Sequence, residues 1–230
     1  MDIYLLPVGG VRYELYCDVR GLDAGEVADD AEVRSGWMRR QVVRFRTMLA
    51  EAEAERDRVE RGEPGERRGG VGRWVMARLA ETIAEQRLLW RVRRIDSARL
   101  VHPSDVPGPD ALALAMRQFE TDFGKHRRWG LIDAAVTAVT GPLFFFVPGP
   151  NLISWYFAFR ALGHYYALRG ARRATTRVTW ETLASDALAD VRDALGLEPV
   201  ARRSRLDAIA AVLGLPKLTH FVERVARRPS

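Results

Sequence analysis

The hydrophobic pattern at the start of the chain predicts a β-hairpin. Two runs rich in β-branched and aromatic residues, IYLLPV and VRYELYC, are joined by Gly9-Gly10, a dipeptide typical of tight hairpin turns. Apolar and polar residues alternate from Val11 to Cys17, as they do in a strand with one buried face. Two strands alone are barely stable in water. We therefore expect helices to cover this ribbon or a third strand, for which residues 98–101 are the candidate, to join it.

Most of the remaining chain has the periodicity of amphipathic helices. Apolar residues recur every three or four positions in two charged segments, at about 26–61 and 73–97, and a linker rich in Gly and Pro separates them. Such a short linker predicts an antiparallel pair, which serves either as a scaffold with a solvated charged face or as a coiled-coil contact with a second copy. A further helix should begin near Pro109, because proline is favoured in the first helical turn.

The pattern changes abruptly between Arg128 and Arg160, where 31 residues carry one formal charge, that of Asp133. A bilayer span needs about 20 apolar residues, but helix-breaking residues in the middle of this segment argue against one straight span. The residues that we predict to form a turn here are Gly141, Pro142, Pro148, Gly149, Pro150 and Asn151. The segment is therefore predicted to be a helical hairpin with arms at about 129–140 and 152–171.

Both ends of this predicted hairpin are basic. The candidate contacts with a membrane or a partner are Arg127, Arg128, Arg169, Arg172 and Arg173. Basic residues flank membrane segments on the cytoplasmic side, so two basic ends suit a re-entrant or interfacial hairpin that touches anionic lipid and keeps both ends on that side. The same apolar arms would serve equally well as the core of a soluble helical protein, and the sequence leaves both alternatives open.

The spacing of the polar residues in the hairpin predicts one buried cluster. If the chain turns near residues 146–148, Asp133 and Arg160 lie level on the two arms and face each other. A buried carboxylate is tolerated when it is paired. His126 lies two helical turns before Asp133, and His164 lies one turn after Arg160. These four residues would form either a buried clamp without proton chemistry or a proton relay, and a relay calls for pKa values near neutrality.

Beyond residue 177 the pattern predicts a small helical tail. A first helix is expected from Thr179 to Leu195, ending before Gly196, and two shorter helices are expected at about 205–213 and 216–227. The tail either packs on the hairpin as scaffold or docks a partner. The predicted fold is mainly α: a helical bundle with a central apolar helical hairpin at 129–171 and a small N-terminal β-hairpin. Its two parts are residues 1–177 and a tail, 178–230, packed on or tethered to them.

Composition and motifs argue against several classes of function. The single cysteine, Cys17, cannot form an intramolecular disulfide. The four histidines lack the spacing of a metal site, and no nucleotide-binding or catalytic motif is present, so we expect no metal, no cofactor and no enzymatic activity. A net charge of +6 among 66 interleaved charges does not indicate nucleic acid. The start MDIYLLPVGG lacks the features of a secretory signal.

Residues 125–174 resemble the signature region of the mitochondrial K+–H+ exchange-related family, which also has bacterial members. The matching elements are His126-Arg127-Arg128-Trp129, Asp133, Gly141-Pro142-Leu143, Pro148-Gly149-Pro150-Asn151, Tyr156, Arg160, Gly163-His164-Tyr165 and Arg169-Gly170-Ala171. The N-terminal ribbon is similar to that family's amino-terminal stretch.

The resemblance implies a required or regulatory role in potassium and proton homeostasis at an energy-coupling membrane. The two basic ends of the hairpin place that role at the cytoplasmic side of the inner membrane. One hairpin is too little for an ion pathway, because transporters place their sites between repeated bundles of helices. We therefore expect a separate transporter or further copies of the chain as partners. The alternative is a soluble, cytoplasmic interaction module whose hairpin is a core or a partner interface, and nucleic-acid binding ranks third.

Overall fold

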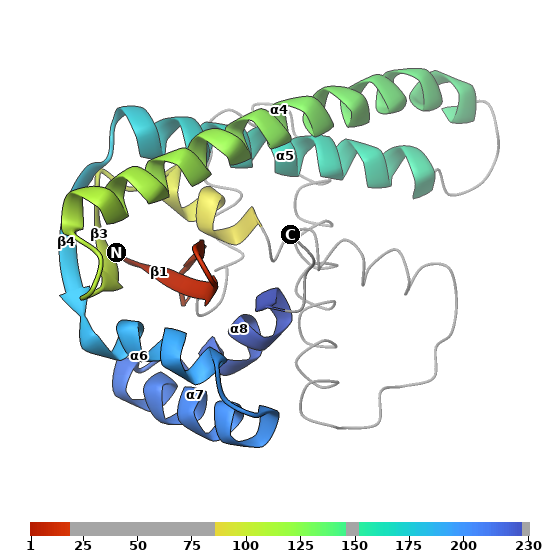
Figure 1. Cartoon of the computed structure of the whole chain (residues 1–230). Helices are drawn as coiled ribbons and strands as arrows, with labels where there is room; N and C mark the ends of the chain where they lie inside the picture. Colours follow the sequence, from red (N-terminus) through yellow and green to blue (C-terminus); the bar gives the residue numbers. More distant parts are fainter. Residues whose placement is uncertain (19–85, 146–151, 227–230) are drawn as a thin grey trace. The chain divides into compact units, whose positions relative to one another are not determined.

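The computed structural model describes residues 1–18, 86–145 and 152–226 of the chain (Figure 1). The described part is mainly helical with a small sheet, which confirms the predicted mainly α class. The helix expected at 26–61 lies outside the described residues, as do Pro148, Gly149, Pro150 and Asn151 of the expected turn. Of the helix expected at 73–97, residues 86–92 are helical, and a turn over the next residues leads into a strand.

The predicted N-terminal hairpin is confirmed. Strands β1 (Asp2–Gly9) and β2 (Arg12–Tyr16) pair antiparallel. Gly9 and Gly10 at the turn have φ values of 143° and 52°, which side chains with a Cβ rarely adopt. The Gly-Gly dipeptide is therefore what this turn requires.

The sheet has four strands in the order β2-β1-β3-β4. Strand β3 (Ser97–Pro103) pairs parallel with β1, which confirms the third strand expected at 98–101. Strand β4 (Thr179–Ser185) pairs parallel with β3, so the prediction of a helix from Thr179 is wrong, and helix α6 (Asp186–Leu195) begins seven residues later. The reason lies in tertiary contacts: the Trp180 ring packs on Phe119, and its Nε1–H donates to the carbonyl of Ala174.

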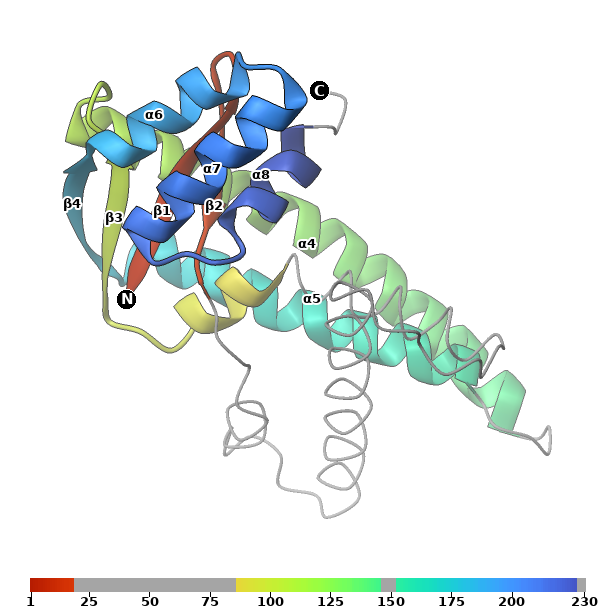
Figure 2. The same cartoon turned by 90° about the horizontal axis from the view of Figure 1, so that it is seen from below.

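The two long helices differ from the expected boundaries. Helix α4 (Gly108–Phe145) runs unbroken through Gly141 and Pro142, which therefore lie in a helix and not in a turn. A proline removes one backbone hydrogen bond, and here that loss does not end the helix. Helix α5 (Leu152–Thr176) is longer than the expected arm. The two helices run side by side in both views (Figures 1 and 2).

The chain divides into two compact units. Unit 1 comprises residues 1–18, 91–124 and 169–230, and unit 2 comprises residues 19–90 and 125–168. In unit 1, α6, α7 (Pro199–Leu213) and α8 (Leu218–Ala226) lie together against the sheet (Figure 2). Their core is shared with it: Leu6 and Val101 of the strands pack with Leu188, Leu206 and Val222 of the helices.

Within residues 1–18, 86–145 and 152–226, no helix is both long enough and apolar enough to cross a bilayer.

Candidate functional site

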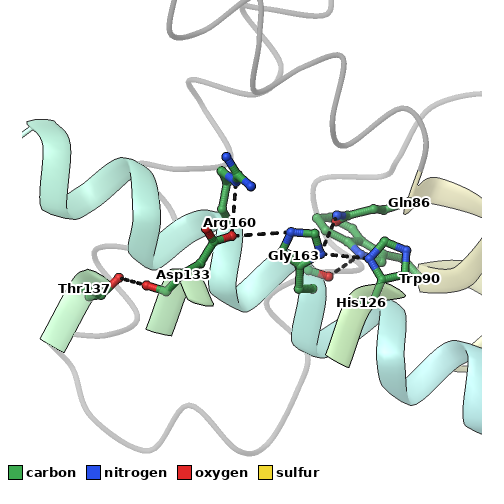
Figure 3. A network of polar contacts seen from close by, with 8 residues as sticks. Gln86, Trp90, His126, Asp133, Thr137, Arg160 and Gly163 are labelled. Atoms are coloured by element: carbon green, nitrogen blue, oxygen red, sulfur yellow. Dashed lines mark hydrogen bonds and ion pairs between the residues drawn. The ribbon is translucent and has the colours of Figure 1, made fainter. Parts of the chain in front are cut away.

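Four polar side chains meet between α4 and α5, entirely within unit 2, and they are the four predicted from the sequence. The Nε atom of Arg160 lies 3.1 Å from Oδ2 of Asp133, and Nε2 of His164 lies 3.4 Å from the same oxygen. On its other side, Nδ1 of His164 is 2.8 Å from Nδ1 of His126. These distances place the side chains in a row in the order Arg160, Asp133, His164, His126, which we call the polar row. Figure 3 shows the row with Arg160, Asp133 and His126 labelled.

Helical spacing and one glycine create this row. Residues 126 and 133 are seven apart on α4, and residues 160 and 164 are four apart on α5, so each pair lies on one helix face. Gly130 lies between the two α4 positions, where a Cβ atom would approach the Cβ of His164 to 3.2 Å. The missing side chain lets the two helices come close enough for their polar groups to touch.

Three members of the polar row are buried, and Arg160 is partly exposed. Asp133 is 1% exposed, His164 4% and His126 5%. Burial raises the pKa of Asp133, because the charged carboxylate loses its hydration, while the neighbouring Arg160 guanidinium acts in the opposite direction. The ion pair with Arg160 is therefore what keeps a buried carboxylate tolerable here.

Burial lowers the pKa of both histidines to about 4. Nearby positive charge acts in the same direction: His164 and Lys125 lower the pKa of His126, and Arg160 and Lys125 lower that of His164. These pKa values lie below the near-neutral range that we expected for a proton relay. Both rings are therefore neutral at pH 7, and the row does not hold an imidazolium.

The contact between the two Nδ1 atoms admits a single proton. If both nitrogens carried hydrogen, two N–H groups would point at each other across 2.8 Å. One ring must therefore donate and the other accept. His164 also faces the Asp133 carboxylate with Nε2, which favours a proton on that nitrogen and a lone pair on Nδ1. His126 is then the donor.

Two further residues of this site were missed by the sequence reasoning. Gln86 Nε2 lies 3.3 Å from Nδ1 of His164, and Trp90 Nε1–H donates to the carbonyl of Gly163 over 3.1 Å (Figure 3). Gln86 and Trp90 are one turn apart in the helical segment 86–92. That spacing is the only signal in the sequence, and nothing local distinguishes this glutamine from one that faces solvent.

Among the candidate basic contacts, four arginines are exposed: Arg127, Arg128, Arg169 and Arg172. Arg173 is instead engaged within unit 1. Its Nε donates to the carbonyl of Ile95 over 3.0 Å, and its guanidinium pairs with Asp96. The sequence could not anticipate this, because Asp96 is 77 residues away along the chain.

The face of α4 opposite the polar row is apolar and exposed. Leu131 is 67% exposed and Val139 71%, and Ile132 between them is also exposed. Arg128 lies on the same face one turn before Ile132. The described part of this helix thus presents hydrophobic side chains outward next to a positive charge.

In the part of the chain that the structure describes, no three His, Cys, Asp or Glu side chains are arranged to hold a metal ion.

Searches for relatives among curated proteins and among solved structures found no match. A family model described as mitochondrial K+-H+ exchange-related matches residues 3–176, a stretch that includes the sheet strands β1 to β3, both long helices and the whole polar row. The chain therefore belongs to the mitochondrial K+–H+ exchange-related family.

Proposed function

We propose that this protein is a non-enzymatic component or regulator of K+–H+ exchange that works at the cytoplasmic side of the inner membrane. The family supplies the link to exchange. The observation that carries the proposal is the buried row of Asp133, His164 and His126, in which neighbouring polar atoms lie 3.4 Å and 2.8 Å apart. A row of this kind can move a proton between two helices.

The proton step balances without any cofactor. A proton that arrives at Nε2 of His126 releases the Nδ1 proton of that ring to Nδ1 of His164, and the Nε2 proton of His164 passes to Oδ2 of Asp133. Both rings end neutral with their protons on the opposite nitrogens, and Asp133 ends as a neutral carboxylic acid. The row has taken up one proton, and Asp133 no longer carries the negative charge that pairs with Arg160. Uptake of a proton therefore weakens the ion pair between Asp133 and Arg160.

Contact with the membrane is supported by the exposed apolar face of α4. Leu131, Ile132 and Val139 are exposed, and Arg127 and Arg128 are exposed at the start of this stretch. Apolar side chains beside basic ones favour the boundary between lipid headgroups and acyl chains, and they favour anionic lipid. In this proposal the protein binds peripherally or by a re-entrant segment, and a transporter or further copies of the chain supply the ion pathway. The alternative hypothesis is a cytoplasmic interaction module in which the same face of α4 binds another protein.

Potassium-driven proton flux tests the function directly. Membrane vesicles from cells that contain the full-length protein are compared with vesicles from cells that lack it, using a pH-sensitive dye. We expect Asp133→Asn, which keeps the shape but cannot accept the proton, to abolish the flux that depends on the protein. The matched control is Asp190→Asn, which makes the same change in the exposed pair between Asp190 and Arg205.

Two results would contradict this function. The first is equal flux with and without the protein. The second is normal flux with Asp133→Asn, even if that variant is less stable, because the row would then be a structural clamp.

A further inference from the structure

The carboxamide of Gln86 is buried against the histidine pair. Gln86 is 2% exposed, and its Nε2 lies 3.3 Å from Nδ1 of His164. Its Oε1 is buried and has no hydrogen-bond partner in the described part of the chain. Leaving a buried acceptor without a partner is unfavourable. Another interaction must therefore favour this orientation of the amide.

That interaction is the contact between His164 and Asp133. If the amide were reversed, Oε1 would face Nδ1 of His164, and this nitrogen would need a proton. Neutral His164 would then present a lone pair on Nε2 to Oδ2 of Asp133, 3.4 Å away, and two acceptors would face each other. With the amide in the orientation of the structure, Nε2–H of Gln86 faces the Nδ1 lone pair that also accepts from His126, and Nε2–H of His164 faces the carboxylate.

Gly163 makes room for this arrangement. A Cβ atom at position 163 would lie 2.8 Å from Oε1 of Gln86 and 3.3 Å from Cζ2 of Trp90. The carbonyl of Gly163 also accepts the hydrogen bond of Trp90, and the Trp90 ring meets Tyr166 edge-on at 6.0 Å between centroids. The helical segment 86–92 therefore docks on α5 at the residue next to His164.

We propose that Gln86 is a positioning residue that keeps Nδ1 of His164 unprotonated, so that the ring proton of His164 faces Asp133. Gln86 thereby selects the resting state of the polar row, with Asp133 ionised and with His126 as the donor to His164. The inference rests on the proposed function and deepens it. It identifies Gln86 as the group that fixes the protonation state from which the row takes up a proton. Within the described residues, the titratable and charged groups that act on the pair are Asp133, Arg160 and Lys125.

Nuclear magnetic resonance of histidine-labelled full-length protein tests this inference. Two-bond correlations between ring protons and nitrogens report which nitrogen of each ring is protonated, and a pH series reports the titration of His164. In the wild type we expect the His164 proton on Nε2 and the His126 proton on Nδ1. Gln86→Glu, which replaces the donor by an acceptor of the same shape, should move the His164 proton to Nδ1.

Two further variants separate the carboxamide from the docking of its helix. Gln86→Met removes the donor without adding an acceptor and should make His164 about tenfold easier to protonate, which corresponds to the loss of one hydrogen bond of about 1.4 kcal/mol. Trp90→Phe loses the hydrogen bond to Gly163 but does not touch the His164 ring. It should leave the tautomer and the titration of His164 unchanged.

A wild-type His164 protonated on Nδ1, an unchanged His164 in Gln86→Glu, or an equal change in Trp90→Phe would overturn the inference. If Gln86→Glu does not fold, an unchanged titration in Gln86→Met overturns it. No flux enters this measurement, so a failure of the proposed function and a failure of the role of Gln86 are separate results.

Discussion

At the scale of single residues, the histidine pair ties the stability of the fold to pH. Each folded ring has a pKa of about 4, compared with 6.5 for an ordinary histidine. Between these values the unfolded chain binds protons that the folded chain does not. The stabilising contribution is therefore present above pH 6.5 and is lost as the pH falls towards 4. The raised pKa of Asp133 acts in the opposite sense and offsets part of this loss.

The expected result is a free energy of unfolding that decreases as the pH is lowered from about 6.5 to 4, by an amount on the order of 3 kcal/mol. His126→Gln removes one of the two titrating rings and should reduce this slope, whereas His220→Gln, at an exposed position, should not. Urea denaturation at a series of pH values measures the slope. Equal slopes for the wild type and His126→Gln would show that the pair does not carry the dependence.

Single residues also show which contacts can be predicted from local sequence and which cannot. The spacing of His126 and Asp133, and of Arg160 and His164, could be recognised because helical periodicity is a local property. The engagement of Arg173 with Asp96 and the approach of Gln86 to His164 could not, because each depends on which distant segments the fold brings together.

At the scale of elements, glycines determine how closely the helices of unit 2 approach each other. Gly163→Ala would place a methyl group against Gln86 and Trp90, and we expect it to lower the free energy of unfolding by about 1–3 kcal/mol. Gly124→Ala is the matched control, because its new Cβ meets nothing within 4 Å. In a helix interior that change should increase stability by up to about 1 kcal/mol. Thermal denaturation compares the two, and shifts of the same sign would contradict this account of the packing.

The elements also differ in how far they could be predicted. The turn at Gly9-Gly10 could be predicted because it needs only its own backbone conformation. Strand β4 could not: its pairing partner β3 lies about eighty residues earlier, with Ala98 opposite Trp180. The continuation of α4 through Pro142 was missed for a related reason. A proline weakens a helix locally, but it does not decide where that helix ends.

At the scale of the whole molecule, the exposed apolar face of α4 predicts binding to anionic membranes. Arg127→Gln with Arg128→Gln should weaken binding of the full-length protein to phosphatidylserine-containing vesicles by about 30-fold, since each basic residue near such a surface contributes about 1 kcal/mol. Sedimentation with vesicles measures the binding. Arg117→Gln with Arg203→Gln is the matched control, because both arginines are exposed and the change in net charge is the same.

The vesicle experiment distinguishes the two partners considered for this face. Equal losses in the two double variants would mean a general charge effect. Absence of binding to any vesicle would refute lipid as the partner and would favour the interaction module.

The amino-acid sequence was sufficient for features that depend on near neighbours: the N-terminal hairpin, the mainly helical character, the helical spacing of the polar residues and the motifs that indicate the family. The tertiary structure was needed for the fourth strand, the unbroken α4, the docking of residues 86–92 at Gly163 and the contact between His126 and His164. The physical reason is that backbone propensity and periodicity act over a few residues. A buried hydrogen bond, by contrast, depends on the position of both partners, and only the folded chain places them.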